Sequence, residues 1–151
     1  MSHVQRIDDR ESLEQILSIA PVCRLALLDG DLPYIVPMNF VYEGSSFYLH
    51  SRKSGKKIDL LRKNKKVCIE TEILGDLISG ETPCDYGYSF KSVIASGTAD
   101  ILEERELKQT ALSKISQKYT GSGWEFDESA LDSVAVIRVT VDSITGKQCL
   151  P

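Results

Sequence analysis

The residues best suited to binding or chemistry form one short segment, His50-Ser51-Arg52-Lys53-Ser54-Gly55-Lys56-Lys57. Residues 52–66 hold eight of the 18 Lys and Arg residues of the chain and a single acid, Asp59. If Ser54 caps a helix, Lys56 and Lys57 fall in its first turn, where each cation opposes the helix dipole by ~0.3–1 kcal/mol. A bound phosphate would reverse that cost, because it would pair with the ammonium groups and accept from the free backbone N–H groups.

Two interpretations of this basic segment remain open on the residues alone. The segment is either a phosphate site, which Gly55 would let a ligand approach closely, or the solvated face of a basic helix. The lysines that follow it, Lys63, Lys65 and Lys66, are assigned to solvated surface.

Other common catalytic patterns are missing from the sequence. It holds no glycine-rich nucleotide loop and no GxSxG elbow, and its two histidines are His3 and His50. The four cysteines have no CxxC spacing and no nearby histidine pair, so we expect reduced thiols and no metal site. Redox chemistry would therefore depend on an imported cofactor.

Size and charge place the chain in a broad class. Its 151 residues predict one domain, spanning residues 1–151, and the net charge of -4 argues against a nucleic-acid partner. No apolar run approaches the ~20 residues that cross a bilayer, and the polar start of the chain does not resemble a secretory signal. We expect a cytoplasmic protein without a membrane partner.

Hydrophobic periodicity predicts more strands than helices. Helices are expected at 9–20, capped by Asp8 or Asp9 and ended by Pro21, and at 54–62 and 104–119. Strands are expected at 22–28, 34–42, 47–50, 67–73, 93–102 and 133–141, with a loop at 76–90. Pro37 cannot donate to a sheet, so it predicts a bulge or an edge strand. The pattern favours a mainly β fold with packed helices, an antiparallel barrel or roll in the α+β class.

These segments also carry a family resemblance. The run PYIVPMNFVYEGSSFYLHSRKSGKKIDLLRKNKKVCIE is followed in order by CDYGYSFKSVIASGTADIL, a helix at 107–119, Trp124-Glu125-Phe126 and VAVIRVTVDSITGK. Together they resemble the FMN-binding split barrels related to pyridoxamine 5'-phosphate oxidase, specifically the nitroimidazole-resistance branch. The resemblance covers nearly the whole chain.

This resemblance implies a six-stranded antiparallel split β-barrel that forms a homodimer, with FMN in each of two clefts between protomers. FAD is the second flavin that such a site would take. The matching cofactor-binding positions are Val36, Pro37, Met38 and Asn39 along the flavin ring, His50, Ser51, Lys53, Ser54, Lys56 and Lys57 around the phosphate, Lys91 and Ser92 at one side, and Trp124 over the cleft.

Three of these positions have an alternative. The branch usually has Arg where Lys91 stands, and lysine lacks the bidentate fork of arginine. Trp124 either closes the cleft, in the same or the partner subunit, or packs half-buried on the barrel. His50 shares a strand face with Tyr48 and is either a hydrogen-bonded polar residue at a strand end or a neighbour of cofactor and substrate, the one candidate catalytic residue.

The function implied is an FMN-dependent oxidoreductase that acts on a small molecule, such as a nitroimidazole or another nitroaromatic compound. The chain has no arginine-rich C-terminal block, so it departs from true pyridoxamine-phosphate oxidases. The alternatives are a non-catalytic flavin-binding or flavin-sensing module, and a split barrel that uses haem or a deazaflavin.

Overall fold

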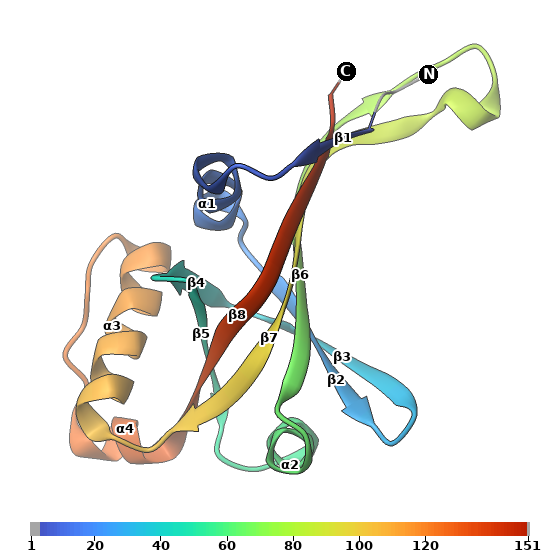
Figure 1. Cartoon of the computed structure of the whole chain (residues 1–151). Coiled ribbons are helices and arrows are strands. Elements are labelled where there is room, and N and C mark those ends of the chain that lie inside the picture. The colour runs from blue at the N-terminus through green and yellow to red at the C-terminus, as the bar shows by residue number, and fades with distance from the viewer. Residues whose placement is uncertain (1–3, 151) are drawn as a thin grey trace.

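The computed structural model describes residues 4–150 and consists of one curled antiparallel sheet with four α-helices around it (Figure 1). The eight strands are ordered β3-β2-β6-β7-β8-β5-β4, and β1 pairs with the far end of β8. In chain order the elements are β1 (Val4–Ile7), α1 (Arg10–Ile19), β2 (Cys23–Asp29), β3 (Leu32–Met38), β4 (Phe40–Glu43), β5 (Ser46–Arg52), α2 (Lys56–Lys63), β6 (Lys66–Ile78), β7 (Gly87–Leu102), α3 (Arg105–Thr120), α4 (Glu128–Ser133) and β8 (Val134–Cys149).

The sheet order confirms the mainly antiparallel split barrel but corrects its strand count from six to eight. β1 was not predicted, and the strand expected at 34–42 is two strands that separate at Asn39. β3 and β4 are neighbours in the chain but form opposite edges of the sheet, so the barrel is open between them. Pro37 lies on edge strand β3 opposite Arg24 in a continuous register, which confirms the edge interpretation rather than a bulge.

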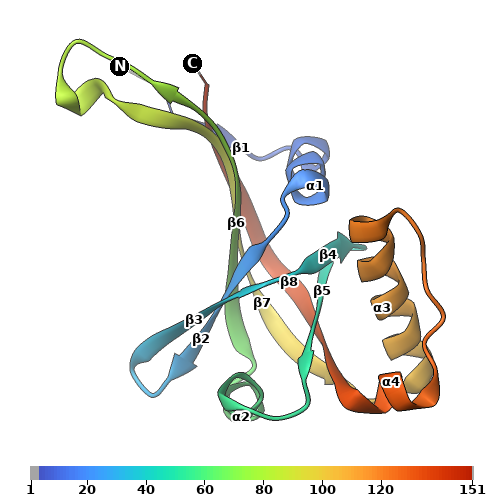
Figure 2. The same ribbon diagram turned by 180° about the vertical axis from the view of Figure 1, so that it is seen from behind.

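The predicted loop at 76–90 was wrong at both ends. β6 continues to Ile78 and β7 starts at Gly87, and only a short 3-10 turn at Pro83–Asp85 joins them. A register shift between Leu74 and Leu77 breaks the alternation of polar and apolar residues, which hid both strands from sequence analysis. The resulting hairpin extends beyond the barrel, at the end opposite α2 (Figures 1 and 2).

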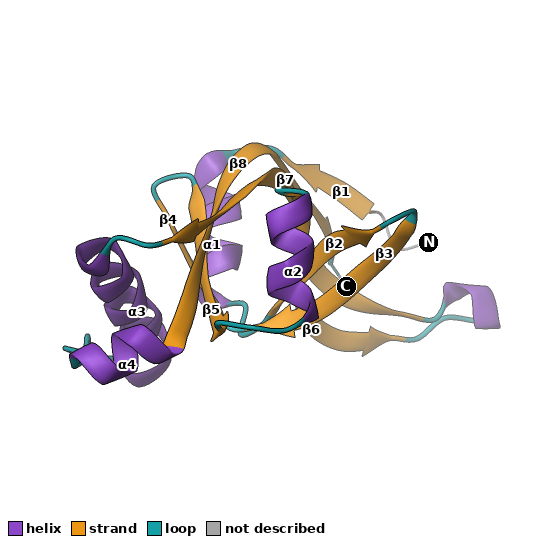
Figure 3. Ribbon diagram, turned by 90° about the horizontal axis from the view of Figure 1, so that it is seen from below, coloured by secondary structure: helices purple, strands orange, loops and turns teal. Residues whose placement is uncertain are grey.

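The helices pack around this sheet. α1 is capped as predicted, because the Ser12 backbone N–H donates to the Asp9 carboxylate at 2.8 Å. α1 packs on β4, β6 and β7, α2 on β2, and α3 on β4, β5 and β8. α2 lies across the end of the barrel that faces the viewer in Figure 3, with α3 and α4 together at one side. No helix among residues 4–150 is long and apolar enough to cross a membrane.

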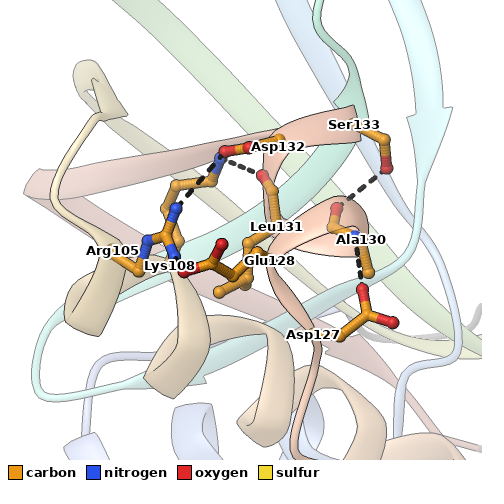
Figure 4. Close-up of polar contacts among 8 residues, drawn as sticks. All are labelled: Arg105, Lys108, Asp127, Glu128, Ala130, Leu131, Asp132 and Ser133. Atoms are coloured by element: carbon orange, nitrogen blue, oxygen red, sulfur yellow. Dashed lines mark hydrogen bonds and ion pairs between the residues drawn. The ribbon is translucent and has the colours of Figure 1, made fainter.

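α4 was not predicted, because six residues are too few for a helical period to show in sequence. Asp127 caps it by accepting from the Ala130 backbone N–H at 2.8 Å (Figure 4). Arg105 of α3 pairs with Glu128, and Lys108 donates to the carbonyl oxygen of Leu131 (Figure 4). These contacts hold α4 against the first turn of α3.

Two apolar clusters stabilise the fold. The main one fills the barrel around Phe40 and Phe47, which are fully buried with ring centroids 5.6 Å apart. The second lies under α3 and α4 and contains Leu102, Ala111, Leu112, Leu131 and Val136.

Tyr119 links α3 to the barrel through its hydroxyl. The hydroxyl accepts from the Phe40 backbone N–H at 3.0 Å and donates to the Pro21 carbonyl at 2.7 Å. We expect Tyr119→Phe to lower the free energy of unfolding by about 1–2 kcal/mol, because the Phe40 N–H loses its acceptor. Urea denaturation measures the change, and Tyr42→Phe is the matched control; equal stability of the two variants would contradict this role.

Candidate functional site

The start of α2 lacks a side-chain cap. Gly55 occupies the cap position with φ of 116°, a conformation that favours glycine, and no side chain among residues 4–150 accepts from the first turn. Ser54, predicted as the cap, was therefore the wrong residue; it lies exposed in the preceding loop. The first N–H groups of the helix are left available to an anion from solution.

The two lysines in the first turn of α2 have different environments. Lys56 Nζ lies 2.7 Å from the Asp29 carboxylate and 4.8 Å from the centroid of the Tyr34 ring, and the carboxylate raises the Lys56 pKa. Lys57 is half-buried and has no ion-pair partner within the described residues. Burial lowers its pKa, as expected for an ammonium group that has lost water without gaining a carboxylate. Of the two lysines in this turn, Lys57 is thus the one without an ion pair in the described part of the chain, and its ammonium group is available to a ligand.

His50 lies at the end of β5, opposite Val136 of β8. Phe47 and Leu49 are buried while Tyr48 and His50 face outward, which confirms the predicted alternation. The His50 pKa is lowered by partial desolvation and by the charge of Lys57, so the ring is neutral at neutral pH. The imidazole lines an apolar cavity of about 270 Å³ formed by β5, the end of α4 and one face of α3.

A second group of cations lies around a pocket between α2 and α3. Lys53, Arg62 and Lys108 line a pocket of about 200 Å³, together with Glu103. Lys108 is only 7% exposed, and its pKa is lowered by burial and by the charge of Lys53.

Lys108 was not among the predicted site residues, because lysine is usually assigned to the exposed face of a helix. Leu107 is exposed, and the buried stripe is Lys108, Ala111, Leu112 and Ile115. The last three follow Lys108 by three, four and seven residues, a spacing in the sequence that predicts one buried face of a helix.

The predicted flavin-ring residues lie at the opposite end of β3 from its turn beside α2. Val36 is half-buried, Met38 is buried, and Pro37 and Asn39 are exposed. β3 pairs only with β2, so one side of its backbone has no strand partner within residues 4–150. That side of the edge strand is available to a planar ligand.

Lys91 and Ser92 are not close to α2 within one chain. In β7, Ser92 pairs with Glu72 and Thr98 pairs with Lys66, the first residue of β6 after α2. Ser92 is therefore six strand residues from the α2 end of the sheet. Six strand residues span ~20 Å, so these two residues cannot contact a phosphate bound to α2 of their own chain.

Trp124 is 64% exposed in the connection between α3 and α4. Its backbone is held by Gln109 and Ser113, while its ring is not packed on the barrel, so the half-buried alternative was wrong.

Ser51 is half-buried and donates to the Arg52 carbonyl at 2.9 Å, which leaves its hydroxyl turned toward its own loop. Residues 4–150 contain no group of three or more metal-ligating side chains.

The outer face of β2 and β6 carries a carboxylate pair. Arg24 lies 2.7 Å from the Glu72 carboxylate and 3.4 Å from that of Glu70. Burial and the neighbouring Glu72 raise the pKa of Glu70 to about 7, against the opposing effect of Arg24.

This raised pKa predicts a pH dependence of stability. Between the ordinary Glu pKa and about 7 the folded chain binds more protons than the unfolded chain, so the free energy of unfolding falls as the pH rises. Glu70→Gln should flatten that decrease, measured by urea denaturation at pH 5 and pH 8. Glu125→Gln, in an exposed loop, is the control; an unchanged slope in Glu70→Gln would contradict the prediction.

Comparisons with known proteins agree with this fold. A solved structure from Bacteroides thetaiotaomicron, described as a candidate 5-nitroimidazole antibiotic resistance protein, is 34% identical with a TM-score of 0.87, and the alignment covers 98% of this chain and 89% of that one. An FAD-binding protein from Mesorhizobium loti is 22% identical with a TM-score of 0.73 over 100% of both chains. A flavocytochrome from Azotobacter vinelandii is 18% identical with a TM-score of 0.87, over 97% of this chain and 70% of that one. The last two likenesses show the shared fold.

A curated relative gives a shorter match. An uncharacterized protein of Rhizobium meliloti is 35% identical over 65 residues, which is 43% of this chain and 42% of that protein. The family described as pyridoxamine 5'-phosphate oxidase matches residues 9–148. With that match over nearly the whole chain and a split barrel shared with solved relatives, the chain belongs to the pyridoxamine 5'-phosphate oxidase family.

Proposed function

We propose that this chain is a homodimeric, FMN-dependent oxidoreductase that reduces a small molecule such as a nitroimidazole or another nitroaromatic compound. The observation that carries the proposal is the uncapped start of α2 beside the unpaired Lys57, in a member of a flavin-using family. The 34% identity to the candidate resistance protein of Bacteroides supports the substrate class.

The residues present fit a flavin. The first N–H groups of α2, Lys57 and Lys53 would hold the phosphate, and Gly55 keeps the approach to it open, because no atom lies within 4 Å of the position that a Cβ would take there. The free backbone edge of β3 at Val36–Asn39 would lie along the ring. When bound, the flavin supplies the electron transfer; FAD would use the same phosphate site.

His50 is the candidate that contacts the substrate. Its neutral ring can donate a hydrogen bond to an oxygen of the substrate without a charge that would have to be desolvated. The apolar cavity beside it, lined in part by Leu112 and Phe126, has a volume of about 270 Å³ and has room for a five- or six-membered ring.

Two further features support the dimer and the compartment. The outer face of the β3-β2-β6-β7 portion of the sheet carries exposed Ile35 and Ile94, which a second copy would cover. The chain acts in the cytoplasm, where its four unpaired cysteines would stay reduced.

An absorbance spectrum of the purified protein with and without added FMN tests the proposal. Flavin bands near ~370 and ~450 nm that co-elute with a dimer, and oxidation of a reduced donor in the presence of a nitroaromatic acceptor, are the expected result. Stoichiometric flavin without turnover would instead indicate a binding or sensing module. No binding on titration would contradict the flavin site itself.

A further inference from the structure

Within residues 4–150, no third strand pairs with the outer part of the extended β6–β7 hairpin. β2 pairs with β6 only as far as Thr71, and β8 pairs with β7 only as far as Phe90, so the segment 74–90 is a two-stranded ribbon beyond the Leu74–Phe90 pair. We call this segment the arm. It projects from the barrel at the end where β1 pairs with the last residues of β8 (Figures 1 and 2). A two-stranded ribbon on its own is at best marginally stable in water, so a surface that packs on it would stabilise it.

The arm exposes large apolar side chains. Leu74 is 63% exposed, Leu77 56%, Tyr86 54% and Tyr88 53%, and these four residues lie close together on one short hairpin. Leu74 also continues the outer face of the sheet, because its place in β6 follows Glu70 and Glu72 on alternate residues. The same face carries the exposed Ile94, so the apolar surface runs from the arm onto the barrel.

The charge of the arm complements that of the α2 end of the molecule. Segment 74–90 contains Asp76, Glu81 and Asp85 and no lysine or arginine, whereas residues 52–66 contain eight cations and one acid. The two regions lie at opposite ends of β6, which starts at Lys66 and ends at Ile78. Thirteen strand residues span ~40 Å, so the arm cannot reach α2 of its own chain.

We propose that the arm of each protomer packs along the α2 end of a second copy and closes the flavin cleft there with Tyr86 and Tyr88. A two-fold axis perpendicular to β6 and β7 places the acidic arm of each copy beside the basic end of the other, and buries the open sheet face between them. The same operation brings the partner's Lys91 and Ser92 toward α2, which they cannot approach within one chain. This inference rests on the proposed flavin site and adds the residues that the partner supplies to it.

Cys84 provides a direct test, because it is the exposed cysteine at the tip of the arm. A short thiol-to-amine cross-linker is applied to an equal mixture of unlabelled and heavy-isotope-labelled full chains, with and without FMN. We expect mixed-isotope peptides that join Cys84 to Lys53, Lys57 or Lys63, and their loss in Cys84→Ser. A dimer without such a link, or a monomer at micromolar concentration by light scattering, would overturn the inference.

A variant pair separates this inference from the flavin proposal. Tyr86→Ser combined with Tyr88→Ser should weaken dimerisation and FMN affinity at least tenfold each, whereas Leu107→Ser, an exposed apolar residue on α3, should change neither. Unchanged dimerisation in the double variant contradicts the arm contact even if FMN still binds. A Cys84 link between copies in a protein that binds no FMN supports the arm contact and contradicts the flavin proposal alone.

Discussion

Lys57→Ala is expected to weaken FMN binding at least tenfold, which corresponds to ~1.4 kcal/mol or more. Lys57 is half-buried beside an uncapped helix start and has no carboxylate partner in the described part of the chain. A phosphate placed there would gain a charge-assisted hydrogen bond, and such bonds contribute ~1.5–3 kcal/mol. Fluorescence titration of the flavin-free protein measures the affinity.

Lys56→Ala is the matched comparison in the same helical turn. Its ammonium group already pairs with Asp29 and is therefore not free to bind the phosphate. We expect Lys56→Ala to weaken FMN binding by less than about threefold. A combined Lys56→Ala and Lys57→Ala variant should again lose at least tenfold, mostly through Lys57. Lys63→Ala, at the other end of α2, controls for net charge. A larger loss in Lys56→Ala than in Lys57→Ala would reverse the assignment of the phosphate contact.

Phe47→Ala is expected to lower the free energy of unfolding by ~3–5 kcal/mol, the range found when a buried aromatic side chain is removed from a core. The Phe47 ring is fully buried between Phe40, 5.6 Å away, and Tyr42, 4.9 Å away between ring centroids. Neither neighbour can fill the space without leaving its own contacts, because protein interiors are close-packed.

Leu107→Ala is the control for this core substitution. Leu107 is exposed on α3, where we expect a change within about 0.5 kcal/mol. Chemical denaturation of the flavin-free chains gives both values. A loss at Phe47 no greater than that at Leu107 would contradict the placement of Phe47 at the centre of the barrel.

Local patterns predicted the parts of the fold that depend on neighbours in sequence. A cap at Asp8 or Asp9, a shared face for Tyr48 and His50, and a bulge or an edge at Pro37 all follow from a few adjacent residues. The structure confirms the shared face and decides the other two in favour of Asp9 and the edge. Prediction failed where a short or irregular segment depends on distant contacts. α4 has only six residues, and the arm has a register shift that disrupts its alternation.

The candidate site shows the same division. The basic segment and the family resemblance that points to a flavin are visible in the sequence, but the different roles of Lys56 and Lys57 are not. They are adjacent on one helical turn, and only the fold places Asp29 of β2 beside one of them. Lys108 was missed because its side chain is buried only through the contact of α3 with α4. There its ammonium group donates to the carbonyl oxygen of Leu131.

The amino-acid sequence alone was enough to identify the family, the first helix start and the strand faces, because hydrophobic period, capping residues and turn residues act over a few positions. The folded chain was needed to learn which cations remain free for a ligand, that β3 and β4 form the two edges of the sheet, and that an acidic arm lies ~40 Å along β6 from the basic α2 end. The physical reason is that charge pairing, desolvation and sheet order depend on residues far apart in the chain, and those meet only when the barrel forms.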